Sequence, residues 1–356
     1  MIKLIPMVKS LEIKDGYLAN KSLNTSNLDC DNRLIGALSY FDTSADGTTV
    51  SIQIDDFGKE EYELIINADS IIIRAGDNAG AFYAIQTLKQ IFKEEKVPCL
   101  NIIDKPDFEY RGFYHDVTRG KIPTVETIKN LIDNLAYYKI NSLQLYVEHV
   151  FEFDEYKDIN ERTGYLTKDE IREIGEYCKD NFIDFIPSLS TFGHLYELLQ
   201  QDKYKHLRIF KDFVPYSNFW YGRMVHHTVN PLLDEGFELI KGIINQYLPN
   251  FESDFFNICC DETFDIKKLD DGENDISMLH ANFVNKLIKH VNSLGKTAML
   301  WADPLLLNHP EMIMNMPKDT YFLSWGYDEN PDEEPIKKFG EMGVKQIVCP
   351  GTSTWA

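Results

Sequence analysis

The 356-residue chain lacks the cysteine patterns that would indicate a metal site or a disulfide framework. Its six cysteines show no zinc-like spacing, and the only close pair, Cys259-Cys260, is adjacent in sequence and lies in an apolar run. His226-His227 has no acid at ligand spacing. We therefore expect buried free thiols in a reducing compartment, no bound metal and no cofactor.

The chain also lacks long apolar runs and an excess of positive charge. Residues 1–16 contain neither an apolar core of signal-peptide length nor a small-residue cleavage site, and no later run is long enough to span a membrane. With 57 acids against 36 bases, the net charge of -21 argues against nucleic acid and anionic membranes as partners. We expect a cytoplasmic protein of unassigned oligomeric state, although a chain can have lost a leader or an anchor.

From Pro106 onward, short apolar strands alternate with amphipathic helices, which is typical of parallel strands joined by crossover helices. Thr124 and Thr167 stand at positions typical of helix N-caps, and Gly295 stands where a helix would end. The strands that we predict are Gly112–Asp116, Ser142–Val147, Ile183–Leu189, Phe255–Cys260, Thr297–Trp301, Tyr321–Trp325 and Val344–Cys349.

Unusual polar and aromatic residues fall at or near the ends of these strands, and in a barrel the carboxyl ends of the strands converge on one mouth. The first predicted strand is followed by residues 118–121, which lack the glycine-rich phosphate loop of an open nucleotide-binding sheet. We therefore predict an α/β fold of the (β/α)8 TIM-barrel type. Only seven strands can be counted, so we expect either a miscount or a barrel truncated at its C-terminus.

Residues 1–105 have a different pattern. Val50–Ile54, Tyr62–Ile66 and Ser70–Arg74 have strand character, and Ala79–Phe92 has helical period. The sequence predicts a small α+β accessory domain over 1–105, followed by the barrel domain over 106–356.

The adjacent acids Asp261-Glu262 follow the apolar run Phe255–Cys260. Neighbouring side chains on a strand point to opposite faces, so two of them share a site only where the strand is ending. Buried acids are costly unless they have partners, which makes the pair a candidate active site. A solvated pair in the turn after a buried strand is the alternative.

Several segments, in order along nearly the whole chain, resemble glycoside hydrolase family 20. Residues 62–64, 71–73 and 79–88 are similar to the accessory domain that precedes the barrel in that family. Residues 110–119 resemble its first barrel strand, and Cys260-Asp261-Glu262 its acid pair. Residues 187–194 (Pro-Ser-Leu-Ser-Thr-Phe-Gly-His) are most similar to the third-strand motif of the hexosaminidase D-like branch.

The resemblance implies an exo-β-N-acetylhexosaminidase that releases terminal β-linked GlcNAc or GalNAc. In this family the acetamide oxygen of the substrate attacks the anomeric carbon, with retention of configuration. The resemblance assigns proton donation to Glu262 and orientation of the acetamide to Asp261. This division is physically reasonable, since two close carboxylates disfavour each other's ionisation and one can stay protonated.

The resemblance also implies sugar-binding residues, each with a structural alternative. Arg111 would bind the sugar hydroxyls at positions 3 and 4, or form an ion pair with an acid. Trp301 and Trp325 would form walls of an acetamide pocket, or pack in the core. The further candidates are His194, Glu148, Asp303 and, near the C-terminus, Trp355, and their alternatives are structural or loop positions.

The sequence also departs from the family pattern. The common His-x-Gly-Gly before the acid pair is Asn257-Ile258-Cys259-Cys260 here, and two common acids of the third strand are Ser188 and Ser190. With these changes and no eighth strand, we expect the chain as given to bind sugar weakly and to turn over poorly. Two alternatives stay open: a catalytically impaired carbohydrate-binding barrel, and a retaining glycosidase that pairs Glu262 with Glu148 or Asp303 as a second ordinary carboxylate.

Overall fold

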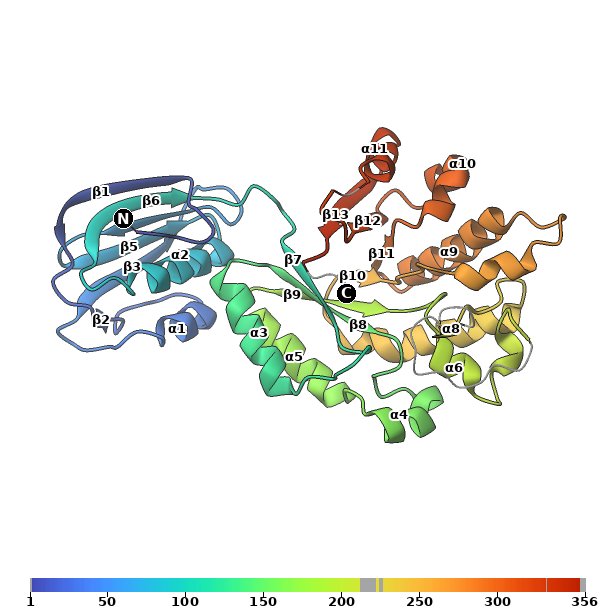
Figure 1. Cartoon of the computed structure of the whole chain (residues 1–356). Coiled ribbons are helices and arrows are strands. Elements are labelled where there is room, and N and C mark those ends of the chain that lie inside the picture. Colours follow the sequence, from blue (N-terminus) through green and yellow to red (C-terminus); the bar gives the residue numbers. More distant parts are fainter. Residues whose placement is uncertain (1, 212–221, 224–226, 331, 353–356) are drawn as a thin grey trace. The chain divides into compact units, whose positions relative to one another are not determined.

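The computed structural model describes residues 2–211, 222–223, 227–330 and 332–352, and the chain divides into two compact units (Figure 1). Unit 1 comprises Met1–Phe113, Thr124–Leu143 and Glu176–Asp184. Unit 2 comprises Tyr114–Pro123, Gln144–Gly175 and Phe185–Ala356. Unit 1 therefore combines the amino-terminal region with helix α3 (Val125–Tyr137) and the end of helix α5 (Lys168–Asp180).

Unit 1 contains a six-stranded mixed sheet in the order β1-β6-β4-β5-β3-β2. Helix α2 (Asn78–Ile91) packs against β4 and β5 through residues that are almost all buried, and the Asp77 carboxylate caps it by accepting a hydrogen bond from the Gly80 N–H. The strands are β1 (Ser10–Tyr17), β2 (Leu23–Asn24), β3 (Thr48–Ile54), β4 (Tyr62–Ile66), β5 (Ser70–Ala75) and β6 (Pro98–Asp104), and helix α1 spans Asn32–Leu38. The predicted strands and helix are confirmed, whereas the sequence analysis missed β1, β2, β6 and α1.

The second sheet carries the predicted barrel strands in the order β13-β12-β11-β10-β9-β8-β7. The pairs from β9 to β13 are parallel. The strands are β7 (Gly112–Asp116), β8 (Ser142–Val147), β9 (Asp184–Leu189), β10 (Phe255–Asn257), β11 (Thr297–Trp301), β12 (Tyr321–Gly326) and β13 (Lys345–Pro350). A doubly wound sheet reverses its strand order at a switch point, whereas this order follows the sequence throughout, as in a TIM barrel.

Helices follow the strands of this sheet as the alternating pattern predicted. Thr124 caps α3 by accepting from the Thr127 N–H, and Thr167 and Glu170 form the predicted capping box at the start of α5. Gly295 has φ +77° just after helix α9 (Ile276–Ser293), as predicted. The remaining helices are α4 (Lys157–Thr163), α6 (Tyr196–Gln200), α8 (Asp234–Tyr247), α10 (Pro310–Met314) and α11 (Glu334–Glu341).

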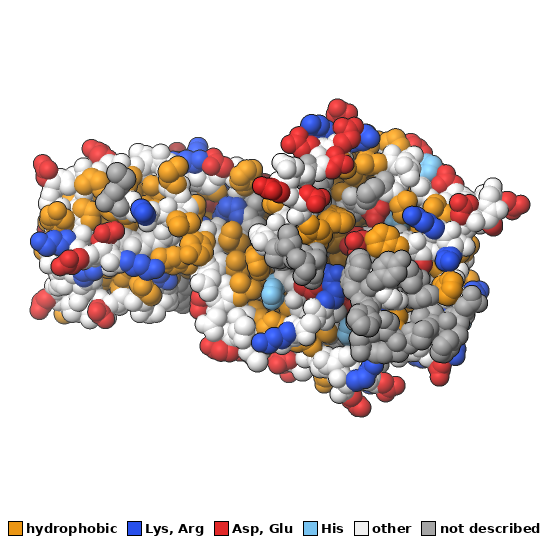
Figure 2. All heavy atoms as spheres, in the orientation of Figure 1, with side chains coloured by type: hydrophobic (Ala, Val, Ile, Leu, Met, Phe, Trp, Pro, Cys, Tyr) orange, Lys and Arg blue, Asp and Glu red, His pale blue; other side chains and the backbone are white. Residues whose placement is uncertain are grey.

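Acidic side chains are scattered over the face of the molecule seen in Figure 2, and basic side chains lie among them. This distribution agrees with the dispersed acids of the sequence, which favour solubility over a single-sign binding surface. Within the described ranges, no helix combines the length and the apolar character needed to cross a lipid bilayer.

Candidate functional site

The acid pair and the histidine that were predicted from the sequence lie together in unit 2. Nε2 of His194 is 3.6 Å from Oδ2 of Asp261 and 3.3 Å from Oε2 of Glu262. Both carboxylates therefore reach one imidazole nitrogen, although adjacent strand residues would point to opposite faces. They can do so because β10 ends at Asn257 and the backbone that follows is irregular.

The turn that carries the acids has an unusual backbone conformation. Cys259, Cys260 and Glu262 have φ values of +57°, +67° and +52°, and His194 has φ +59°. Non-glycine residues rarely adopt this left-handed region, and they do so mainly where surrounding structure holds them. The two cysteines occupy the positions at which the family pattern has Gly-Gly, which explains why glycine suits that pattern.

His194 is almost fully buried and lies between three carboxylates, with Nδ1 3.7 Å from Oε1 of Glu148. Burial, the largest single influence, lowers the pKa of His194. The charge of Asp261, hydrogen bonds to Asp261 and Glu262, and the charge of Glu148 together outweigh burial and raise the pKa to about 10. His194 is therefore an imidazolium at neutral pH, bound between the acid pair and Glu148.

Glu148 lies behind His194 and is itself buried. Its Oε1 accepts a 2.8 Å hydrogen bond from the Tyr146 hydroxyl. The hydroxyl oxygen of Tyr146 in turn accepts a 3.1 Å bond from the Ser190 hydroxyl. Burial raises the pKa of Glu148, and the charges of His194, Arg223 and Arg119 oppose this rise. These contacts favour Glu148 as the carboxylate that pairs with the His194 imidazolium, and its predicted role in sugar binding stays a prediction.

Asp303 holds the backbone of the acid pair in place. Its Oδ2 accepts a 3.1 Å bond from the Glu262 N–H, and its Oδ1 accepts a 2.9 Å bond from the Leu305 N–H, where Asp303 caps a short helix. Both carboxylate oxygens bond to the backbone and the side chain is buried, which gives Asp303 a structural role. Its role in binding a sugar hydroxyl stays a prediction.

His227 is a second support that the sequence analysis missed. Its Nδ1 accepts a 3.1 Å bond from the His194 N–H, and its Nε2 lies 2.9 Å from the Glu262 carbonyl oxygen, which it can only donate to. One neutral ring therefore ties together the two turns that carry the charged groups. The pair His226-His227 drew attention in the sequence only as a metal motif, and His226 lies outside the described residues.

The tryptophans have mixed surroundings. Trp301 belongs to a buried apolar cluster and meets the Tyr114 ring edge to face at 5.0 Å, and Trp325 packs against the same cluster with Tyr327 5.4 Å away. Core packing therefore accounts for part of each side chain, and their role as pocket walls stays a prediction. Trp355 lies outside the described residues.

The prediction that Arg111 binds sugar is contradicted by its position. Arg111 precedes β7 and so lies at the amino end of that strand, whereas barrel sites form at the carboxyl ends. Its guanidinium donates to Oε2 of Glu60 (2.8 Å), the Lys139 carbonyl oxygen (2.8 Å) and the Tyr83 hydroxyl (3.2 Å). The N–H donors of the Arg111 guanidinium bond to acceptors within unit 1, so the ion-pair alternative is correct.

Arg119 is the arginine at the carboxyl end of β7, and the sequence analysis did not select it. Its Nε donates a 2.6 Å bond to Oδ2 of Asp116, and its guanidinium carbon lies 4.7 Å from the centre of the Tyr146 ring. The available signal was its spacing: Arg119 comes three residues after the last residue of the strand, in the loop that a barrel directs to its mouth.

The same cluster offers metal-ligand atoms. One atom each of His194, Asp261 and Glu262 lies within 4.8 Å of the others, and among the described residues this is the group that could hold an ion. A metal needs the neutral imidazole as its ligand, so an ion would have to displace the proton that the surrounding acids favour on His194. The same three groups are also suited to acid-base chemistry.

Comparison with known proteins gives two family matches that together span most of the chain. Residues 108–355 match "Glycosyl hydrolase family 20, catalytic domain", and residues 35–105 match "Glycosyl hydrolase family 20, domain 2". A beta-hexosaminidase of Porphyromonas gingivalis is 28% identical over 285 residues, which are 69% of this chain and 36% of that protein. A beta-hexosaminidase of Vibrio furnissii is 24% identical over 345 residues, covering 83% of this chain and 52% of that protein.

Solved structures share the fold. The exo-β-N-acetylglucosaminidase of Vibrio harveyi, crystallised with N-acetylglucosamine, has a TM-score of 0.77 at 21% identity, over 99% of this chain and 61% of that one. The β-N-acetylhexosaminidase of Streptomyces coelicolor has a TM-score of 0.78 at 18% identity, over 98% and 74%. The chain spans about a third to a half of the length of the two beta-hexosaminidases named above. The catalytic-domain match, which covers more than half of the chain and contains every residue of the acid cluster, shows that this protein belongs to glycosyl hydrolase family 20.

Proposed function

We propose that this chain is an exo-β-N-acetylhexosaminidase that releases terminal β-linked GlcNAc, and GalNAc as a further substrate, from glycans. The observation that carries the proposal is the shared contact of Asp261 and Glu262 with the buried His194. A cation flanked by acids at the carboxyl end of a barrel strand suits a reaction in which charge and a proton are transferred. Membership of family 20 supports the sugar class.

In the proposed mechanism the substrate supplies its own nucleophile. The acetamide oxygen attacks the anomeric carbon and forms an oxazolinium ion, while the Glu262 carboxylic acid protonates the leaving glycosidic oxygen. Water then attacks the same carbon, and Glu262 accepts the proton of that water, so the product retains the β configuration. The contact between His194 and Glu262 would stabilise the carboxylate that Glu262 becomes once it has given up its proton.

Asp261 is suited to hold the acetamide. Its Oδ1 is buried and makes no hydrogen bond within the described part of the chain. A buried acceptor without a donor is costly, and an acetamide N–H would satisfy it. The negative charge of Asp261 would then stabilise the positive charge that develops on the oxazolinium ring.

Arg119 replaces Arg111 as the proposed ligand of the sugar hydroxyls. It follows β7 at the carboxyl end, and Asp116 and the Tyr146 ring orient its guanidinium. A planar set of N–H donors suits neighbouring hydroxyl groups of a pyranose. The acetamide-pocket role of Trp301 and Trp325 remains part of the proposal.

A retaining glycosidase with two ordinary carboxylates receives less support. That mechanism needs a second acid roughly 5 Å from Glu262, free to attack the sugar. The His194 ring lies between Glu148 and Glu262, and both oxygens of Asp303 are bonded to the backbone. The remaining alternative is a carbohydrate-binding barrel with impaired catalysis. A measurement of hydrolytic activity distinguishes it from the proposed enzyme.

The test is hydrolysis of aryl β-GlcNAc and β-GalNAc by the chain, with Glu262→Gln and Asp261→Asn variants and the exposed Glu334→Gln as the matched control. We expect Glu262→Gln to lower kcat by about 10²–10⁴-fold, the range for general acid-base groups, and the control to match the wild type. A thiazoline that mimics the oxazolinium ion should inhibit. Hydrolysis that survives Glu262→Gln, or plain β-glucosides cleaved regardless of the thiazoline, would refute the mechanism.

A further inference from the structure

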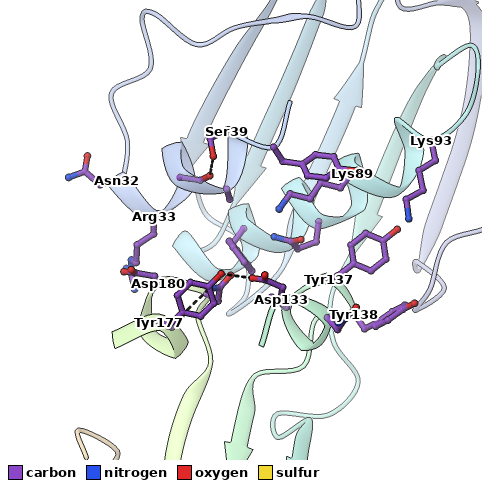
Figure 3. Close-up of a pocket in the computed structure, with 18 residues that line it drawn as sticks. Asn32, Arg33, Ser39, Lys89, Lys93, Asp133, Tyr137, Tyr138, Tyr177 and Asp180 are labelled. Carbon is purple, nitrogen blue, oxygen red and sulfur yellow. Dashed lines mark hydrogen bonds between the residues drawn. The ribbon is translucent and has the colours of Figure 1, made fainter. Parts of the chain in front are cut away.

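A hollow of about 860 Å³ lies within unit 1, among helices α1, α2 and α3 and the end of α5 (Figure 3). Its volume is within the range of small-molecule sites, which is about 300–1,000 Å³. None of its lining residues belongs to the acid cluster of unit 2. The hollow is therefore a feature separate from the proposed active site.

Small side chains keep this space open. Gly36 and Ala37 of α1 and Ala136 of α3 line it, where larger residues would fill it. A Cβ atom added to Gly36 would meet nothing within 4 Å. Gly36 is an exposed residue that lines the hollow, so a bulky side chain at position 36 can obstruct the hollow without its Cβ meeting a neighbouring atom.

Gln86 supplies a polar group in the lining. It is only 2% exposed and lines the hollow. An amide offers both donors and an acceptor, so Gln86 can hydrogen-bond to a ligand in the hollow. Phe82, Gln86, Lys89 and Lys93 lie at i, i+4, i+7 and i+11 of one helix, and therefore on one face of α2.

The walls combine aromatic rings with charged groups of both signs. Nζ of Lys89 lies 5.2 Å from the centre of the Tyr40 ring, and the Tyr177 hydroxyl donates a 2.8 Å bond to Oδ1 of Asp133. Figure 3 shows Asp133 and Tyr177 side by side at one edge of the hollow, with Lys89 at another. Tyr40 is more than half exposed, so its ring is accessible to a ligand.

We propose that this hollow binds a neutral oligosaccharide. Sugar hydroxyls need donors and acceptors together, which Gln86, Lys89 and Asp133 supply, and the apolar faces of a pyranose pack on tyrosine rings. A phosphate ligand would need unopposed positive charge, whereas Asp133 and Asp180 accompany the lysines, and Arg33 is already paired with Asp31 at 2.6 Å. The choice of an N-acetylglucosamine oligomer, chitotriose, as the test ligand rests on the proposed function.

The experiment titrates the chain with chitotriose after the active site has been saturated with the thiazoline inhibitor. Calorimetry should show one further trisaccharide bound per chain. We expect Gly36→Phe and Gln86→Leu each to weaken this binding at least about tenfold, through lost space and lost hydrogen bonds. Gly242→Phe in α8 is the matched control, because it is another helical glycine whose added Cβ meets nothing within 4 Å.

A second readout is independent of catalysis. In a ¹⁵N-labelled chain, the side-chain amide signal of Gln86 should shift on titration with chitotriose and stay in place in Gly36→Phe. A chain that fails to hydrolyse aryl β-GlcNAc but shows the Gln86 shift would refute the proposed function and retain this site. No further saccharide bound, or equal affinity in folded Gly36→Phe and Gly242→Phe chains, would refute the site.

Discussion

At the scale of single residues, Arg111 and Arg119 show that residue type matters less than position along a strand. Both flank β7, one before its first residue and one after its last. Arg111 is bound within unit 1 by Glu60, whereas Arg119 lies over the Tyr146 ring beside the network of His194. Mutation of Arg119 should therefore lower activity, whereas mutation of Arg111 should lower stability.

We expect Arg119→Met to lower kcat/KM on aryl β-GlcNAc by about 10–100-fold, through loss of charged hydrogen bonds to the sugar. Arg111→Met should leave kcat/KM within about twofold, and should lower the free energy of unfolding by ~3 kcal/mol, because Glu60 would stay buried without its partner. Steady-state kinetics and urea unfolding of both variants provide the measurements. A larger kinetic loss in Arg111→Met would restore the original prediction.

His194 should make stability depend on pH on the alkaline side. Its folded pKa of about 10 lies above the ordinary 6.5, so the folded chain binds the proton more tightly. The stabilisation is complete below about pH 6.5 and declines as the pH rises towards 10. Urea unfolding at pH 6 and pH 9.5 should show a smaller difference for His194→Gln than for the wild type, and an equal difference would contradict the assigned charge.

At the scale of elements, the end of β10 differs from its prediction. The apolar run predicted a strand to Cys260, but the strand stops at Asn257, because Cys259 and Cys260 take positive φ values that no extended strand can include. An apolar pattern reports burial and carries no information on the sign of φ. The irregular turn then positions Asp261 and Glu262 on one side.

The left-handed conformation at Cys260 should make this position intolerant of β-branched residues. We expect Cys260→Val to destabilise the fold by ~2 kcal/mol more than Cys178→Val, since both cysteines are buried but Cys178 lies in helix α5. Thermal and urea unfolding give the comparison. Equal losses would mean that overpacking, and not the backbone, decides tolerance at position 260.

Local pattern predicted most of the barrel. Gly112–Asp116, Ser142–Val147 and Thr297–Trp301 were placed with their observed bounds, because short apolar runs between turn residues carry a strong signal. In the fully exposed strand β1, the apolar alternation of Leu11 and Ile13 is broken by Asp15, and so short a pattern does not indicate a strand. The acid pair with His194 was also predicted, whereas the roles of Arg119 and His227 depend on distances between strands, which no local pattern contains.

At the scale of the whole molecule, family membership gives the fold, and the sugar class belongs to the proposed function. The charge state of the His194 cluster bears on whether the site works by acid-base or by metal chemistry. His194, Asp261 and Glu262 could hold an ion if the imidazole were neutral. The proton that the neighbouring acids favour on His194 would compete with an ion for the imidazole. The predicted cytoplasmic location and the predicted truncation stay predictions, because neither the fold nor the site bears on them.

We therefore expect hydrolysis to be unaffected by prolonged dialysis against a strong chelator, and elemental analysis of the purified chain to find less than one transition-metal ion per molecule. Rates measured before and after dialysis should agree within error. A loss that added zinc or manganese restores would assign the cluster to a metal and would remove Glu262 from its role as a free acid.

The bridge through His227 has a consequence for motion. Because one ring accepts from the His194 N–H and donates to the Glu262 carbonyl, neither turn can open without breaking a bond to the other. Rare openings should therefore be concerted, and in hydrogen exchange the backbone amides of His194 and Glu262 should report a single opening event with one free energy. Replacing the ring would let the proton donor fluctuate independently of its cationic partner, so the reactive geometry would be present for only a fraction of the time.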